Sequence, residues 1–325
     1  MKALTLEKYG LPEKVLRLTE QKVPSPQNNE VLVKIHSTAI NDYDWSLVRG
    51  KPLIYRMMFG LVKPKSKSLG MELSGTVEAV GTDVTEFKIG DEVYGDTSAH
   101  GFGTFAEYIS LPPKALAHKP NSMSFEEAAS IPHAALLALQ GLQDIGGIKN
   151  GMMVLINGAG GGVGTIALQL AKIHHCEVTG VDRQEKFEAL SNLGYDHLIN
   201  YKQENFTKNG VEYDLILDCK TDKLPFSYSR SLKANGVYVS IGGKATYLLS
   251  TLIIGKVLSI FSSKKFEILS LKSNQGLSEI GEMYERKQIK PVIDGPYPLS
   301  FGPEKLQKFG NGNHIGKIVL NINSL

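Results

Sequence analysis

The sequence predicts an α/β protein with two domains, one rich in β-strands and one built on a doubly wound parallel sheet. Three observations support this. Short strands punctuated by glycine and proline fill the first third, strands alternate with helices from Met152 onward, and a glycine-rich turn lies at 158–164. The length of 325 residues fits about two domains. We expect the domain boundaries at 122/123 and 275/276, with both chain ends in the first domain.

The N-terminal third has the pattern of short strands. Residues 31–35 alternate in the period of a half-buried strand, and further strands are expected at 74–80, 90–93 and 104–109. Strands of this length with glycine, proline and aspartate between them are typical of a small barrel or sandwich.

The pattern changes near Ser122. Ser124 followed by Glu127 has the capping-box spacing of a helix start. Strands and helices then alternate, which predicts a parallel sheet with helices on both faces. The strands are expected at 152–157, 177–181, 197–200, 213–218, 236–241 and 266–271. A last strand at 316–322 is expected to return to the first domain and close it.

Charge and composition exclude several function classes. The net charge of +3 comes from 36 basic and 33 acidic residues, so nucleic acid is not an expected partner. Two cysteines, Cys176 and Cys219, cannot form a disulfide framework. The apolar run 247–261 is too short to span a membrane and predicts a buried or pocket-lining helix. The N-terminus has no apolar signal core, so we expect a cytoplasmic location without membrane contact.

The strongest local signal is the segment 153–172. An apolar strand leads into glycines, and apolar residues at helical spacing follow. This order is the context that a dinucleotide-binding loop requires, because glycine lets the backbone approach a pyrophosphate at a helix N-terminus. The pattern is Ala159-x-Gly161-x-x-Gly164, with alanine in the first glycine position. A structural glycine turn without a ligand is the alternative.

The next strand ends at Asp182, which is placed to bond the ribose hydroxyls of NAD. Arg183 and Lys186 follow, and a cation there can pair with the 2′-phosphate of NADP. The residues therefore support both cofactors at this point.

The whole chain resembles the zinc-independent medium-chain dehydrogenases/reductases of the quinone oxidoreductase, zeta-crystallin-like group. The resemblance rests on the order and spacing of several segments. They are AINDYDWSLVRG (39–50), GMELSGTVEAVG (70–81), GDEVYG (90–95), GTFAEY (103–108), NGAGGGVGTIALQLAK (157–172), GYDHLINYKQENF (194–206) and YDLILDC (213–219). It implies a GroES-like catalytic domain over 1–122 and 276–325, a Rossmann domain over 123–275, and a nicotinamide in the cleft between them.

Zinc-containing relatives differ at two positions. Their ligating cysteine corresponds to Asn41 and their ligating histidine to Met71, and neither asparagine nor methionine is a usual zinc ligand. We therefore expect no metal. Without one, an electron-poor C=C bond or a quinone is an easier substrate than a simple alcohol.

The resemblance also implies site residues. Asn41 is expected close to the nicotinamide, with Asp44 orienting it, closing its loop or acting as a turn or cap residue. The residues expected to bind the cofactor are Asn41, Ala159, Gly161, Gly162, Val163, Gly164, Asp182, Arg183, Lys186, Tyr201, Ile241, Gly242, Asn313 and His314. Lys186 and Tyr201 match residues at the 2′-phosphate and adenosine end, which favours NADPH, with NADH as an alternative.

Two segments depart from the family pattern. Leu137 stands where many relatives have a threonine that touches the nicotinamide. Segment 51–68 matches poorly and is expected to form one wall of the substrate cleft. Its Tyr55 is a candidate for orienting a substrate carbonyl or supplying a proton, with simple packing as the alternative.

The expected function is an NAD(P)H-dependent reductase of quinones or α,β-unsaturated carbonyls, working as a homodimer. One alternative is a zinc-free enoyl-thioester reductase whose basic groove would use Lys63, Lys65 and Lys67, which also suit a solvated loop. Another is a non-catalytic NADPH-binding structural or regulatory protein.

Overall fold

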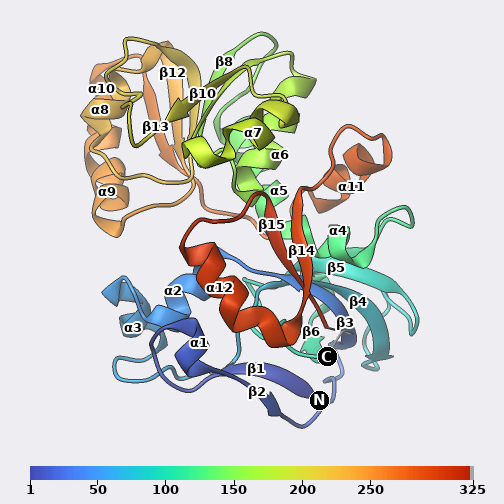
Figure 1. The fold of residues 1–325 in the computed structure, drawn as a ribbon. Coiled ribbons are helices and arrows are strands. Elements are labelled where there is room, and N and C mark those ends of the chain that lie inside the picture. Colours follow the sequence, from blue (N-terminus) through green and yellow to red (C-terminus); the bar gives the residue numbers. More distant parts are fainter. Residues whose placement is uncertain (323–325) are drawn as a thin grey trace. The chain divides into compact units, whose positions relative to one another are not determined.

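The chain folds into two compact units, seen in a computed structural model that describes residues 1–322 (Figure 1). The first unit contains Met1–His133, Ser273–Glu285 and the segment from Pro291 onward, and the second contains Ala134–Lys272 and Arg286–Lys290. The last three residues of the expected 276–325 segment lie outside the described residues.

A seven-stranded, mainly antiparallel sheet forms the centre of the first unit. Its order is β14-β15-β3-β4-β5-β7, with β6 also paired to β3. The strands are β3 (Val31–Ala39), β4 (Glu72–Val80), β5 (Glu92–Asp96), β6 (Tyr108–Leu111), β7 (Ala117–His118), β14 (Ile293–Pro298) and β15 (Lys317–Asn321), and a separate hairpin joins β1 (Lys2–Leu6) to β2 (Leu16–Glu20). β15 pairs antiparallel with β3, which confirms the predicted return of the C-terminal strand.

Short helices surround this sheet. They are α1 (Pro12–Val15), α2 (Asp42–Arg49), α3 (Leu53–Phe59), α4 (Phe125–Ser130), α11 (Leu277–Glu285) and α12 (Gly302–Gly310). The predicted capping box begins α4, since Ser124 Oγ accepts the Glu127 N–H at 3.1 Å and Glu127 Oε2 accepts the Ser124 N–H at 3.0 Å. Because α4 packs on β3 and β4, it belongs to the first unit, although the expected boundary preceded it.

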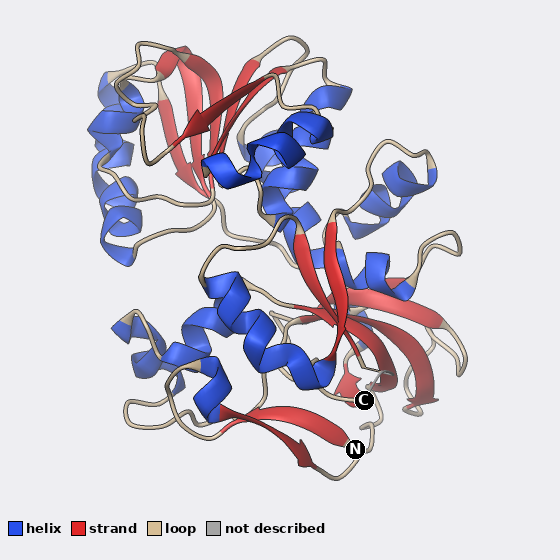
Figure 2. Cartoon of the chain, in the orientation of Figure 1, coloured by secondary structure: helices blue, strands red, loops and turns tan. Residues whose placement is uncertain are grey.

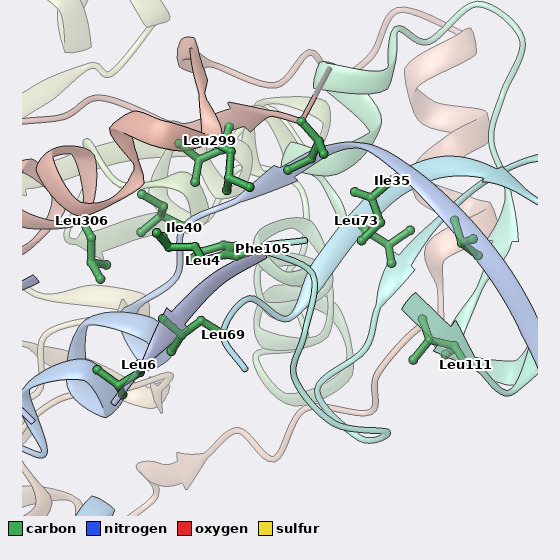
Figure 3. Close-up of a cluster of buried hydrophobic side chains, with 14 of the residues drawn as sticks. Leu4, Leu6, Ile35, Ile40, Leu69, Leu73, Phe105, Leu111, Leu299 and Leu306 are labelled. Atoms are coloured by element: carbon green, nitrogen blue, oxygen red, sulfur yellow. The ribbon is translucent and has the colours of Figure 1, made fainter. Parts of the chain in front are cut away.

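The core of the first unit is a cluster of buried apolar side chains, which come from the sheet strands and from the hairpin and helices around them (Figure 3). Leu4, Leu73 and Phe105 are among its buried members. Regular strand structure begins only at Tyr108, so the prediction of a strand over 104–109 is wrong for residues 104–107. Phe105 enters the core there, and Ala106 makes only an isolated bridge to Ala3.

The second unit is a six-stranded parallel sheet with helices on both faces (Figure 2). The strands are β8 (Met153–Asn157), β9 (Glu177–Asp182), β10 (His197–Asn200), β11 (Tyr213–Asp218), β12 (Leu232–Ser240) and β13 (Lys265–Ile268). The helices are α6 (Gly162–Ile173), α7 (Phe187–Leu193), α8 (Pro225–Ser229), α9 (Ala245–Ser250), α10 (Lys256–Phe261) and all but the first two residues of α5 (Pro132–Leu139), which belong to the first unit. A strand is found at each of the six predicted places, although β12 begins four residues earlier than predicted and β13 ends three residues earlier.

The strand order of this sheet is β10-β9-β8-β11-β12-β13. This is the doubly wound order, in which the chain reverses direction across the sheet between its first and fourth strands. Here the reversal falls between β8 and β11, where Asn157 pairs with Asp218 at the carboxyl ends of both strands. Ligands of such sheets bind beyond this point, which directs attention to the loops that follow these two strands.

The apolar run 247–261 is helical. Of the two predicted alternatives, a buried helix is wrong, and a helix that lines a pocket stays a prediction. Thr251 and Gly255 face the sheet, and a Cβ at Gly255 would lie 2.8 Å from the Phe266 side chain. Large side chains point outward instead, with Ile260 76% and Phe261 84% exposed. Among the described residues, none of the helices has the length and hydropathy to cross a bilayer.

Candidate active site

The turn between β8 and α6 has the geometry of a phosphate-binding loop. Gly158 adopts φ +95°, and a Cβ at Gly164 would lie 2.4 Å from the Gly158 carbonyl oxygen, so the turn needs glycine at both positions. At Gly161 a Cβ would meet only that same oxygen, at an ordinary 3.5 Å. The fold itself therefore leaves room at Gly161.

The N-terminus of α6 begins directly beyond this space. Gly161 is its N-cap and offers no side chain, and Gly162, Val163 and Gly164 form the first turn. Backbone N–H groups of a first helical turn lack acceptors within the helix and favour a bound anion. An uncapped helix start beside an open glycine fits the pyrophosphate of a dinucleotide. Ala159 is fully buried beneath this turn.

Tyr195 supports the loop from below, a contact that sequence reasoning missed. Its hydroxyl lies 3.2 Å from the carbonyl oxygen of Ala159 and 3.0 Å from that of Gly164. Room for the ring comes from Gly180 on β9, where a Cβ would lie 2.8 Å from the ring. The tyrosine within GYDHLIN and the glycine at the centre of β9 were the available signals.

Asp182 at the end of β9 binds this loop with its carboxylate. Oδ2 accepts the Gly160 N–H and Oδ1 the Arg183 N–H, both at 2.8 Å. The Lys186 ammonium lies 3.5 Å from Oδ1, and both side chains are about nine-tenths buried. Burial lowers the pKa of Lys186, and the Asp182 charge opposes that shift. Tyr201 lies nearby, with 54% of its surface exposed.

A buried hydrogen-bond network joins the carboxyl ends of β8, β11 and β12. Asp218 accepts from Asn157 Nδ2 at 2.7 Å and from the Tyr238 hydroxyl at 2.8 Å. Burial raises the pKa of Asp218, against the hydrogen bonds that favour its charged form. The Ile241 N–H donates to the Asp218 carbonyl oxygen, which fixes the Ile241–Gly242 turn at this edge. Burial also raises the pKa of the Cys219 thiol to about 12, which opposes a nucleophilic role.

Asn41 and Asp44 begin α2 in the first unit. Asp44 accepts the Asn41 N–H with one oxygen and the Gly70 N–H with the other, both at 2.9 Å. Burial raises the pKa of Asp44 to about 6, although both N–H donors and the nearby Lys317 ammonium oppose the rise. With both oxygens engaged, Asp44 caps the start of α2 and closes the loop to Gly70; its role in orienting the Asn41 side chain stays a prediction.

Asn41 is the centre of a buried cluster with Glu72 and Lys317. Its Nδ2 donates to Glu72 Oε1 at 2.8 Å, and its Oδ1 accepts from the Lys317 ammonium. Lys317 Nζ also lies 2.6 Å from Glu72 Oε1, and Glu72 Oε2 accepts the His133 N–H at 2.9 Å. Sequence reasoning missed Glu72, His133 and Lys317; the signal for Lys317 was a lysine at the start of an apolar strand.

This donor set does not fit Zn²⁺. Met71 is buried, Asn41 has both ends of its amide bonded within the protein, and a lysine ammonium occupies the cluster. In the part of the chain that the structure describes, no group of three or more histidine, cysteine, aspartate or glutamate side chains is arranged to hold a metal ion.

The remaining candidates make other contacts. Tyr55 on α3 packs edge-on against Tyr43, with ring centroids 5.2 Å apart, and burial raises its pKa to about 12. The His314 ring stacks on Phe309, and the Asn313 N–H donates to the Lys308 carbonyl oxygen. Leu137, at the threonine position of relatives, is buried in α5.

Comparison with known proteins agrees with this geometry. Residues 27–121 match the alcohol dehydrogenase GroES-like domain, and residues 193–320 match the zinc-binding dehydrogenase family. A mitochondrial NAD(P)H oxidoreductase, RTN4IP1 of Bos taurus, is 33% identical over 99% of this chain and 89% of its own length. The chain belongs to the medium-chain dehydrogenases/reductases, in the quinone oxidoreductase group. It is an oxidoreductase that uses a nicotinamide cofactor.

Two further similarities bear on the substrate. The 2-methylene-furan-3-one reductase of Solanum lycopersicum is 30% identical over 98% of this chain and 79% of its own length. The solved structure of the quinone oxidoreductase from Coxiella burnetii superposes with a TM-score of 0.88 at 28% identity, covering 99% of both chains. The fold prediction of a GroES-like domain with a Rossmann domain is confirmed.

We predict that Lys317→Met strongly destabilises the protein. It leaves the buried Glu72 carboxylate without its cation, and breaking a buried ion pair costs about 3–5 kcal/mol. Lys202→Met is the matched control, because its pair with Glu185 is exposed and such pairs contribute under about 1 kcal/mol. Urea denaturation measures both, and equal losses would contradict the assignment.

A second prediction concerns Gly161→Val. We expect a folded protein that no longer binds the dinucleotide, because the side chain fills the space beside the α6 N-terminus without meeting the fold. Gly164→Val provides the contrast, since its Cβ would overlap the Gly158 carbonyl oxygen and should lower the melting temperature. Cofactor titration by fluorescence and thermal unfolding separate the two effects. Unchanged cofactor affinity in Gly161→Val would refute the loop assignment.

Proposed function

We propose that this protein reduces quinones or α,β-unsaturated carbonyl compounds with NADPH and without a metal. The observation that carries the proposal is the buried Lys317–Glu72–Asn41 cluster, which replaces a zinc donor set with a fixed ammonium and amide. The uncapped start of α6 beside Gly161 supports a dinucleotide as the second partner. The names of the relatives support the two substrate classes.

The chemistry divides between cofactor, substrate and protein. A reduced nicotinamide supplies the hydride when it is bound. A quinone or enone spreads the incoming charge over its carbonyl groups, so no Lewis acid is required. The protein then contributes binding and orientation, which lower the barrier by holding the partners in a reactive arrangement. In this proposal Asn41 and Asp44 shape the floor of the substrate site, and Tyr55 belongs to its wall.

We assign the adenosine end of the cofactor to the loop after β9. Lys186 and Arg183 bind the 2′-phosphate of NADPH, with Tyr201 against the adenosine. Support comes from the position of the Lys186 ammonium, which would lie 3.2 Å from a Cβ at Gly160 of the glycine loop. Asp182 is already bonded to the Gly160 and Arg183 N–H groups, which reduces its capacity to select NADH through the ribose. The remaining cofactor contacts are assigned to Ile241, Gly242, Asn313 and His314.

We further propose a homodimer. The outward apolar side chains of the helical stretch 245–261, among them Ile253, Ile260 and Phe261, lie beside the edge strand β13 and offer a surface for a second copy. The cytoplasmic location stays a prediction, and the name of the Bos taurus relative places that protein in the mitochondrion.

The function is tested by NADPH oxidation against a panel of quinones, enals, enones and enoyl-CoAs. We expect turnover of the quinones or enones, equal activity after chelation and dialysis, and no zinc by elemental analysis. A preference for enoyl-CoAs would favour a thioester reductase, for which Lys63, Lys65 and Lys67 are exposed and accessible to a CoA phosphate. Cofactor binding without any turnover would favour the non-catalytic alternative.

Cofactor choice gives a separate prediction. Lys186→Ala should weaken NADPH use about ten- to a hundredfold, because an ion pair with a phosphate is worth about 1–3 kcal/mol, and should leave NADH use nearly unchanged. Lys202→Ala is the control, since this lysine is exposed and pairs with Glu185. The measurement is kcat/KM with both cofactors. Equal losses for NADH and NADPH would show that Lys186 does not bind the phosphate.

A further inference from the structure

The first unit contains a histidine–carboxylate pair that the proposed hydride transfer does not use. His133 Nδ1 lies 2.7 Å from Asp96 Oδ2, and the Asp96 side chain is fully buried. The other oxygen of Asp96, Oδ1, accepts the Ser98 N–H at 2.8 Å. Although burial alone would raise the pKa of Asp96, the His133 and Ser98 contacts hold it below its usual range. Asp96 is therefore a carboxylate, and His133 Nδ1 donates to it.

This pairing fixes how the imidazole presents its second nitrogen. With Nδ1–H committed to Asp96, Nε2 is the acceptor in the neutral ring and a second donor in the charged ring. The side chain is 21% exposed, and among the described residues Nε2 has no hydrogen-bond partner and is not among the buried unpaired atoms. A buried carboxylate behind an accessible imidazole nitrogen is the arrangement of an acid–base histidine.

The pair is connected to the Asn41 cluster through the backbone. The His133 N–H donates to Glu72 Oε2, while Glu72 Oε1 accepts from Asn41 Nδ2 and lies against the Lys317 ammonium. His133 also stands at the start of α5, where its main chain is held by this buried carboxylate. The ring position is thus fixed on both sides, by Asp96 through the side chain and by Glu72 through the backbone.

We propose that His133 is the proton donor of the reductase, with Asp96 as the residue that positions it. The inference rests on the proposed function. Hydride addition to an enone or quinone leaves an enolate or a hydroquinone anion, which needs one proton. The Nε2–H bond of the imidazolium breaks, its electron pair stays on the ring, and the electron pair of the anion forms the new C–H or O–H bond. Neutral His133 regains its proton from water.

Histidine suits this role better than the earlier candidate, Tyr55. A histidine exchanges its proton near neutral pH, whereas burial raises the pKa of Tyr55 to about 12. The charged groups around His133 are Asp96 on β5 and Glu72 on β4. Beyond Asp96 lie His100 and Lys114, which interact electrostatically with each other, and His100 also interacts with Asp96.

The variants that test the proposal are His133→Gln, Asp96→Asn and, as the control, His100→Gln. His100 is a second histidine near Asp96, but the ring that is hydrogen-bonded to the Asp96 carboxylate is that of His133. General acid catalysis is worth about 10²–10⁴-fold, so we expect His133→Gln to lower kcat at pH 7 by about a hundredfold or more. Asp96→Asn should also lower kcat, and His100→Gln should leave kcat unchanged. Cofactor affinity should stay unchanged in all three.

Two readouts separate an acid–base role from a structural one. The wild-type kcat should fall as pH rises, because only an imidazolium can donate the proton, and the His133→Gln profile should lose that dependence. Nitrogen-15 NMR of the protein without substrate should show His133 protonated at Nδ1 when neutral, a preference that Asp96→Asn should abolish. Thermal unfolding shows whether each variant folds. If His133→Gln or Asp96→Asn does not fold, the kcat of the other variant and the NMR spectrum of the wild type still test the proposal.

The outcomes distinguish the two proposals. Wild-type turnover with an equally active, folded His133→Gln variant would overturn the proton-donor role and leave the reductase function standing. A neutral His133 protonated at Nε2 would also overturn it. A wild type that binds NADPH but reduces no member of the panel would overturn the proposed function, and the proton-donor role with it.

Discussion

The buried carboxylate of Glu72 is the constraint on which the first unit depends. A charge without water needs partners, and Glu72 obtains three: the Lys317 ammonium, the Asn41 amide and the His133 N–H. These groups come from β15, from the start of α2 and from the start of α5. One carboxylate on β4 therefore connects segments that are more than 270 residues apart in the chain. The proposed substrate floor and the proposed proton donor are held by the same charge.

In the second unit, the backbone N–H groups at the start of α6 have no side-chain cap, which suits the proposed binding of a dinucleotide pyrophosphate. Glycines at 158 and 164 allow the turn, but the turn is held by two side chains beneath it. Tyr195 reaches the carbonyl oxygens of the loop, and Asp182 accepts the Gly160 N–H. Asp182 holds the loop and also pairs with Lys186. The geometry of the loop and the proposed choice of cofactor therefore depend on the same carboxylate.

Elements with a strong local period could be predicted, and elements held by tertiary contacts could not. The six parallel strands and the Ser124 capping box follow from apolar runs and local cap chemistry. Apolar and polar residues alternate over 104–107, as in a strand. In the structure, however, Phe105 is buried in the core, and these residues form no regular strand. The run 247–261 is apolar enough to be buried, but small residues at Thr251 and Gly255 face the sheet and leave the large ones outside.

The sequence by itself determined the glycine loop and the positions of the parallel strands along the chain, because each depends on a pattern within one short segment. It determined the family through the order and spacing of several such segments. Only the tertiary structure decided which polar groups meet. Nothing local in the sequence joins Lys317 to Asn41 across 276 residues, or Asp96 to His133 across 37. Such pairs form because burying a charge is costly unless the charge is paired and hydrogen-bonded. Its partner is whichever group the fold places beside it, and that group can be distant in the sequence.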